Sequence, residues 1–274
     1  MYTCRLGLEV RYRYTETRQN AVAAACRGKV LEETSRSTHT ARALMGLREK
    51  ILSGDYPGGT RLFEVSLAET LQISRTPVRE VMSRLSEEGL LDRLPNGGFV
   101  VRSFTYADAV DAIELRGVLE GTAMRLAAER GVSTEGLDRL HRLIAQLDAC
   151  FSDTTAEVDL EAYSGLNAEF HGLVVELSGS TVIRREVERA TRLPFASPSA
   201  FLSGREHVAA FRQSLHIAQD QHRSIVSAIA AREGARAEFL GREHARIARK
   251  NLEYAVHENP ELIQSVAGLA LLSS

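Results

Sequence analysis

The chain has 274 residues, of which 44% are hydrophobic and 26% charged, a composition typical of a globular protein of about two domains. The absence of Trp and an aromatic content of 6% argue against a stacking surface for single-stranded nucleic acid, and no apolar run approaches the roughly 20 residues that span a bilayer. Residues 38–102 carry 9 Lys+Arg against 8 Asp+Glu, whereas residues 103–274 carry 18 against 24. Only the N-terminal part is therefore expected to tolerate a polyanion such as DNA.

The three cysteines, Cys4, Cys26 and Cys150, are odd in number and far apart. They indicate reduced thiols in a cytoplasmic protein, and neither a disulfide framework nor a zinc ribbon. The residues before Cys26 are too polar for the apolar core of a secretion signal, so secretion is not expected.

The first elements in chain order predict short helices. Residues 1–37 show no sustained periodicity and are expected to form a mobile extension. The spacing of apolar residues then predicts helices over residues 40–52, 66–71 and 76–89. Thr76 is the expected N-cap of the last helix and Pro77 its first helical residue. Two short helices joined by so tight a turn are typical of a helix-turn-helix motif.

A β-hairpin is predicted to follow these helices. The sequence PNGG (95–98) separates the apolar runs LLDRL (90–94) and FVVR (99–102), and Asn-Gly between two such runs is a strong hairpin signal. Three helices followed by a hairpin indicate a winged helix-turn-helix DNA-binding domain over residues 38–102.

Only helical patterns follow Ser103. Thr105 and Asp108 form a potential capping box for a helix that continues to about Gly131, and Ser133 caps the next helix. Further helices are predicted over residues 157–178, 181–192, 207–231 and 235–256. We therefore expect a mainly α protein, in which the winged helix-turn-helix precedes an all-α antiparallel bundle over residues 103–256. A weakly patterned tail that could dock on the domains occupies residues 257–274.

Two arginines near the start of the predicted recognition helix need a partner. Arg75 and Arg79 place positive charge at the helix end where the dipole is already positive. A phosphate backbone from outside the protein would resolve this conflict.

Four residues of the helical half form a candidate metal site. Asn167 and His171 are four residues apart and share a helix face. His222 and His244 lie 11 residues on either side of position 233, where a turn is predicted, so an antiparallel helix pair would place them at one level. A single inward histidine is usually a satisfied core residue, but three on three helices favour a metal. Imidazole suits Zn, Ni, Cu or Fe, and an oxygen ligand extends the range to Mn.

Arg116 lies in the middle of the first long helix and allows two interpretations. It could form an exposed pair with Glu120 four residues later. It could instead point inward and bind the carboxylate of a ligand through two hydrogen bonds. Periodicity leaves both open.

These segments together resemble the GntR family of bacterial transcription regulators, in its FadR-type branch with an FCD effector domain. The resemblance covers about residues 39–255. It is carried by LAETLQISRTPVREVMSRLSEEGLL and NGGFVV in the first half, and by ELRGVLEGTAMRLAAERG, NAEFH, QHRSIVSAI and the later His244 in the second half.

The resemblance implies roles for individual residues. Ser74, Arg75, Thr76, Arg79 and Gly98 match the family's DNA contacts, with Arg75 reaching a guanine edge and Gly98 letting the wing approach the duplex. The family's metal positions correspond to Asn167, His171, His222 and His244, and Arg116 is the candidate effector contact. The first metal position is often Asp in the family, so Asn167 is a departure. A neutral ligand leaves the metal's charge uncompensated, and we expect such a site to depend on an anionic effector.

The expected function is that of a homodimeric transcriptional regulator, more often a repressor in this family, that binds a double-stranded DNA operator and not a membrane. A small carboxylate at a divalent metal ion (Zn first, with Ni, Mn or Fe as alternatives) would control its affinity for DNA. One alternative is a metal-responsive regulator without an organic effector. The other is a metal-dependent hydrolase, which lacks H-E-x-x-H and an evident general base and leaves SRTPVRE unexplained.

Overall fold

The computed structural model describes residues 40–152, 158–193, 195–200, 209–259, 261, 266 and 268–273. The predicted extension over residues 1–37 lies outside these residues, as do the expected start of the helix at 207 and parts of the tail. Helices dominate the described residues, and a small three-stranded sheet accompanies the first of them. The expected fold class is confirmed.

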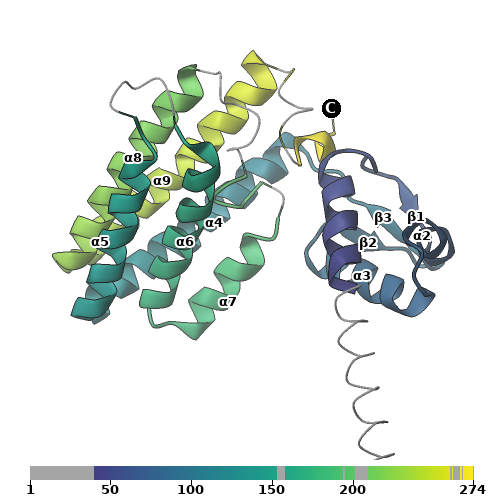
Figure 1. Cartoon of the computed structure of the whole chain (residues 1–274), viewed down its shortest axis with the longest axis horizontal. Helices are drawn as coiled ribbons and strands as arrows, with labels where there is room; N and C mark the ends of the chain where they lie inside the picture. The colour runs from purple at the N-terminus through teal and green to yellow at the C-terminus, as the bar shows by residue number, and fades with distance from the viewer. Residues whose placement is uncertain are drawn as a thin grey trace, which may run out of the picture.

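The N-terminal region is a winged helix-turn-helix (Figure 1). Residues 40–52 are helical, and they are followed by α2 (Glu64–Leu71) and α3 (Arg75–Glu87). The apolar face of α3, which includes Val78, Val81 and Leu85, is fully buried. This burial holds the helix against its neighbours and leaves its polar face in solvent.

The predicted hairpin is present as β2 (Leu91–Arg93) and β3 (Phe99–Val101), which pair antiparallel. The sheet has a further strand, β1 (Arg61–Leu62), beside β3 in the order β1-β3-β2. The strand β1 was not predicted, because two residues are too few to show the alternation of apolar and polar side chains that marks a strand.

Two predicted helix starts are wrong. The N-cap of α3 is Ser74 rather than Thr76, so Pro77 occupies the third helical position instead of the first. Proline is tolerated there because the amides of the first turn have no intrahelical partner in any case. The helix α2 begins at Glu64, two residues before the predicted start at residue 66.

The C-terminal half is a bundle of long helices (Figure 1). Its members are α4 (Tyr106–Arg130), α5 (Thr134–Ala149), α6 (Leu160–Leu177), α7 (Thr181–Ala190), α8 (Ala209–Ala230) and α9 (Gly234–Glu253). The capping box of Thr105 and Asp108 is formed, and the side chain of Ser133 caps α5. A single π turn, Tyr254–Glu258, extends α9.

Glycines bring α4 and α9 unusually close together. A Cβ at Gly117 of α4 would lie 2.8 Å from the Cβ of Ala245, and one at Gly241 of α9 would lie 2.4 Å from the sulfur of Met124. No larger residue fits at either position without a shift of the helices. The close approach places the middle of α4, with Arg116, against the segment of α9 that carries His244.

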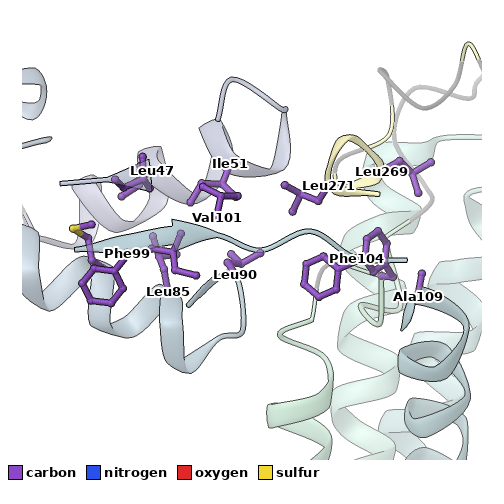
Figure 2. Packing of buried hydrophobic residues seen from close by; sticks show 14 of the residues in the cluster. Leu47, Ile51, Leu85, Leu90, Phe99, Val101, Phe104, Ala109, Leu269 and Leu271 are labelled. Carbon is purple, nitrogen blue, oxygen red and sulfur yellow. The ribbon is translucent and has the colours of Figure 1, made fainter. Parts of the chain in front are cut away.

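The end of the chain docks where the two halves meet. The amide of Phe104 donates to the carbonyl of Leu271 (2.9 Å), and the amide of Ser273 donates to the carbonyl of Phe104 (2.8 Å). Leu269 and Leu271 are buried in one cluster with Leu47 and Ile51 of the first helix, as Figure 2 shows. Helix 40–52, β3, the start of α4 and the tail therefore share one hydrophobic core.

We expect a Leu271→Ala variant to lose about 2–5 kcal/mol of unfolding free energy, because a fully buried leucine is removed from this shared core. Urea denaturation followed by circular dichroism measures the loss. The half-buried neighbour Leu272, replaced by alanine, is the control and should cost clearly less. Equal unfolding midpoints for Leu271→Ala and the wild type would show that the docked tail contributes nothing to stability.

Candidate functional site

The predicted DNA-contact residues at the start of α3 lie together on the surface. Ser74, Arg75, Thr76 and Arg79 are all exposed. Ser74 caps the helix through its backbone only, because its side chain makes no capping hydrogen bond. The structure therefore leaves hydroxyl and guanidinium donors at one end of the helix, where an incoming phosphate or base edge could reach them.

A residue that the sequence analysis missed, Glu64, pairs with both arginines. Arg79 donates from Nε to Oε1 (2.7 Å) and from Nη2 to Oε2 (2.8 Å) of Glu64, and Arg75 Nη2 lies 4.0 Å from Oε2. The hydrogen bonds from Arg79 lower the pKa of Glu64. The conflict between these arginines and the helix dipole is thus reduced inside the protein, and an outside anion is not required to explain them.

Gly98 lies at the turn between β2 and β3 with a φ of +81°. A Cβ there would lie 3.1 Å from the carbonyl oxygen of Leu62 and 3.3 Å from the ring of Phe63. The conformation and the close approach of β1 both require glycine at this position. The fold alone accounts for Gly98, and its contact with DNA stays a prediction.

The helical half brings three histidines together. One nitrogen from each of His171 on α6, His222 on α8 and His244 on α9 lies within 4.8 Å of the others, and all three side chains are buried. The equal distance of His222 and His244 from the turn does place them at one level, because their Nε2 atoms are 3.1 Å apart. Asn167 is also buried, one turn before His171.

Two of these histidines contact side-chain amides, and one of these amides fixes a tautomer. Gln219 donates its amide nitrogen to the carboxylate of Asp148 and to the carbonyl of Ile144, so its Oε1 must face Nδ1 of His222 as an acceptor (3.0 Å). Nδ1 of His222 therefore carries the proton and Nε2 is bare. The side-chain amide of Gln221 faces Nδ1 of His244, with Oε1 at 3.1 Å, and His244 has the same tautomer when this oxygen is the acceptor.

The buried carboxylate of Glu120 lies beside the third histidine, His171. Glu120 Oε2 lies 3.1 Å from Nδ1 of His171, at an angle outside that of a hydrogen bond, and 3.8 Å from Nε of Arg116. The exposed fractions of Arg116 and Glu120 are 2% and 1%. The interpretation of these two as an exposed pair is wrong, because the pair forms in the interior. Sequence spacing alone did not reveal this burial.

A small cavity of about 40 Å³ connects these groups. Its polar lining includes Arg116, Asn167, His171 and His244, and its apolar lining includes Leu215 and Ile247. Two carbonyls of the segment Phe195–Ala200 accept hydrogen bonds from this lining, since Arg116 Nη1 donates to Ala196 (3.4 Å) and Asn167 Nδ2 donates to Pro198 (3.3 Å). The amide oxygen of Asn167 thus stays available as a ligand.

Burial shifts the protonation of the site. It lowers the pKa of His222 and of His244 well below the usual value, and the neighbouring imidazoles add to this effect. Burial alone would raise the pKa of Glu120, but His171 and Arg116 outweigh it and lower this pKa to about 2. Near neutral pH the site therefore holds two neutral imidazoles and an ionised carboxylate.

We expect the unfolding free energy, measured by urea denaturation in the presence of chelator, to fall as the pH drops below about 6.5. Because the folded pKa values of His222 and His244 are lowered, the unfolded chain binds protons that the folded chain does not. The loss approaches about 2.7 kcal/mol per pH unit for the two histidines. The contribution of Glu120 to the unfolding free energy is present above pH 4.5 and is lost only between pH 4.5 and about 2, below the range in which the two histidines act.

A double variant, His222→Gln with His244→Gln, should flatten this dependence between pH 7 and 5. The exposed His141, replaced by glutamine, is the control and should leave the dependence as in the wild type. A wild-type protein with constant stability over this range would show that the two imidazoles accept protons without unfolding.

Comparisons with known proteins agree on one family. The model described as "Bacterial regulatory proteins, gntR family" matches residues 40–101, and the FCD domain model matches residues 111–246. The Nta operon transcriptional regulator of Aminobacter aminovorans is 32% identical over 64% of this chain and 76% of its own length. The HTH-type transcriptional repressor GlaR of Escherichia coli is 28% identical over 72% of this chain and 88% of its own length. The Glc operon transcriptional activator of the same species is 25% identical over 76% of this chain and 86% of its own length.

Solved structures show the same fold. E. coli McbR/YncC superposes with a TM-score of 0.53 at 22% identity, over 80% of this chain and 98% of that chain. The structure of Lar, which "controls the expression of the Listeria monocytogenes agr system", superposes with a TM-score of 0.53 at 20% identity, over 79% of this chain and 96% of that chain. Among the described residues, no helix has the length and apolarity that a bilayer crossing requires. The families and relatives are transcriptional regulators rather than enzymes, and the chain belongs to the GntR family, with a helix-turn-helix domain followed by an FCD domain.

Proposed function

We propose that the protein is a homodimeric repressor whose affinity for its operator is controlled by a small carboxylate bound at a metal ion in the FCD domain. The proposal divides the chain into the DNA-binding domain over residues 38–102, the effector and dimerisation domain over 103–256, and flanking segments over 1–37 and 257–274. The DNA contacts would be Ser74, Arg75, Thr76, Arg79 and Gly98.

The observation that carries the metal site is the close approach of two buried imidazole nitrogens, the Nε2 atoms of His222 and His244, which are 3.1 Å apart. With the Nδ1 proton of each ring donated to a glutamine oxygen, the lone pairs of both Nε2 atoms face each other. Two lone pairs at this distance repel unless they share a proton or a metal ion lies beside them. Zinc, with nickel, manganese or iron as alternatives, fits three imidazoles and an amide oxygen.

The carboxylate behind His171 supports the same proposal. A histidine that binds a metal generally donates its other ring proton to a carboxylate or a carbonyl, which orients the ring. Nδ1 of His171 lies 3.1 Å from Oε2 of Glu120, where a small rotation of the ring would form this hydrogen bond and leave Nε2 for a metal. Asn167, through Oδ1, would complete the protein ligands, and the cation would offer its remaining positions to an anion.

The balance of charge favours an anionic effector. Arg116 and Glu120 are buried together and compensate each other, while the imidazoles of His222 and His244 are neutral. A divalent cation held by Asn167 and these histidines would thus keep its full charge inside the protein. Because an isolated buried charge is costly, an anion in the cavity would stabilise the site. A carboxylate could bind both the cation and the unpaired Nε of Arg116.

A second copy of the chain would supply the second helix-turn-helix that binding to a two-part operator requires. Helix-turn-helix dimers read two half-sites about one helical turn apart. On α4, Leu115 and Val118 are three residues apart, and their exposed fractions of 47% and 40% are high for apolar side chains. They lie on one helix face and provide an apolar surface that a second α4 could cover.

The segment Phe195–Ala200 would couple the effector cavity to the DNA-binding domain. Its carbonyls contact Arg116 and Asn167, and the ring of Phe195 packs edge-to-face on Phe104 (5.4 Å between centroids). Phe104 in turn holds the docked tail and belongs to the core of the winged domain. An effector that displaces either carbonyl would move Phe195 and change the angle between the halves.

We expect Phe195→Leu to keep metal and carboxylate binding but to reduce the change that the effector causes in DNA affinity. An effector typically changes the affinity for the second ligand by about 5- to 150-fold. In Phe195→Leu the ratio of the DNA affinities with and without the carboxylate should approach 1. Anisotropy titrations of an operator duplex, with and without the carboxylate, measure this change in DNA affinity for the wild type and for Phe195→Leu. Undiminished coupling in Phe195→Leu would show that the signal takes another route.

The proposed function is tested by titrating the protein against the DNA upstream of its own gene at two salt concentrations. Chelator, zinc and a panel of small carboxylates are the variables. Salt-sensitive binding with a footprint of dyad symmetry, released by a carboxylate only when metal is present, supports the proposal. Release by metal alone would instead indicate a metal-responsive regulator. Tighter binding with the carboxylate would contradict a repressor that its effector releases from the operator.

A further inference from the structure

The buried polar atoms without a partner gather around one cavity. In the part of the chain that the structure describes, the buried side-chain atoms that lack a hydrogen-bond partner belong to four residues, which are Arg116, Glu120, Tyr163 and His171. Arg116, Tyr163 and His171 line the cavity, and Glu120 lies behind two of them. Glu120 and His171 approach each other at 3.1 Å, whereas Arg116 Nε and the hydroxyl of Tyr163 lack a hydrogen-bond partner and belong to residues of the cavity wall. Native proteins rarely leave such groups unpaired, so these two indicate a ligand with more than one polar group.

The proposed metal and carboxylate give a role to three of these four residues. His171 would ligate the cation with Glu120 behind it, and Arg116 would bind the carboxylate. The hydroxyl of Tyr163 remains without a role. Tyr163 lies one turn of α6 before Asn167, and its exposed fraction is 1%. Burial holds the pKa of Tyr163 well above its usual value, so the hydroxyl keeps its proton and can donate it.

We infer that Tyr163 is a specificity-determining residue of the effector site, which donates a hydrogen bond to a second polar group of the ligand. The effector class would then be a small carboxylate that carries a further hydrogen-bond acceptor, such as a hydroxyl or oxo group. This inference rests on the proposed function. A cavity of about 40 Å³ favours an acid of few carbon atoms.

The chemistry of the lining agrees with this assignment. The other side chains that face the cavity include Leu215, Ala218, Ile247 and Ala248, which are apolar. The hydroxyl of Ser214 already donates to the carbonyl of Phe211 at 2.7 Å. A ligand without an acceptor for Tyr163 would leave that hydroxyl buried and unpaired, and the site would discriminate against it.

The test compares the wild type with Tyr163→Phe, which removes one oxygen and keeps the ring. Isothermal titration of the zinc-loaded proteins uses pairs of acids that differ by one hydroxyl: glycolate and acetate, lactate and propionate, malate and succinate. The wild type should prefer the hydroxylated member of at least one pair by about tenfold, a factor typical of one hydrogen bond. In Tyr163→Phe the preference should fall to within about twofold, with binding of the unsubstituted acid unchanged.

Thermal unfolding without added acid and with chelator provides a second measurement. Tyr163→Phe should be at least as stable as the wild type, since it removes an unpaired buried hydroxyl. A clearly lower melting temperature would overturn the inference, because it would show that the hydroxyl has a structural partner. Tyr56→Phe, at a half-buried tyrosine of the winged domain, is the matched control and should leave acid binding unchanged.

The two possible failures are distinguishable. If the wild type binds these acids and Tyr163→Phe keeps the same preference, the role of Tyr163 is overturned and the proposed function stands. If the zinc-loaded wild type binds none of the acids, the carboxylate effector itself is overturned, and the role of Tyr163 falls with it.

Discussion

Replacing Arg75 by alanine is expected to weaken operator binding by about 30-fold to 10⁴-fold while leaving the fold intact. An arginine that contacts a guanine edge contributes about 1–3 kcal/mol of discrimination, and a dimer would lose two such contacts. Arg75 is the first residue of α3, its side chain is 64% exposed, and its contact with Glu64 is a distant one at 4.0 Å. Anisotropy titrations with the operator and with a random duplex separate the loss of specific affinity from the loss of general affinity.

A substitution at Glu64, which removes the acidic partner of the arginines instead of an arginine, is the matched control for this prediction. Glu64→Gln removes the carboxylate that pairs with Arg79 and approaches Arg75, so both guanidinium groups become available to phosphates. Affinity for random DNA should rise, and the ratio of operator to random affinity should fall. Equal losses of operator and random binding in Arg75→Ala would contradict a base contact, and would assign Arg75 to the phosphate backbone.

Much of this fold could be predicted because its signals are local. The capping box of Thr105 and Asp108 and the Asn-Gly turn of the wing depend on residues within a few positions of one another. The contact of His222 with His244 was also predictable, although the two are 22 residues apart. A short turn between two helices makes their register a matter of counting, and the structure has that turn between Ala230 and Gly234.

The features that the sequence analysis missed depend on contacts distant in sequence. The pairing of Glu64 with Arg79 joins two helices, and nothing in the local sequence distinguishes Glu64 from the acids that lie in solvent. The burial of Arg116 with Glu120 follows from the close approach of α9, which two glycines permit. The docking of Leu271 on Phe104 spans most of the chain. Local periodicity shows that a residue faces inward, but not which partner it meets there.

The largest effect in the helical half is expected from His222→Gln. Removal of a ligand should cost more than the 10- to 100-fold in metal affinity that is typical for the loss of an outer partner. The variant should also lose the stabilisation by zinc that the wild type shows, because it lacks one of the two facing nitrogens. Competition with a chromophoric chelator measures the affinity, and His141→Gln on the surface is the control. Unchanged zinc affinity in His222→Gln would overturn the metal site.

Asn167→Asp tests the same centre in the opposite direction. Without metal, the variant should be less stable than the wild type, since it replaces the amide that donates to the carbonyl of Pro198 with a buried carboxylate. With zinc the order should reverse, because an anionic ligand compensates the charge that Asn167 leaves in place. The variant should hold zinc tightly without any carboxylate, whereas the wild type should need one. Zinc affinities measured with and without the carboxylate decide this, and equal dependence in both proteins would show that the neutral ligand does not couple metal to effector.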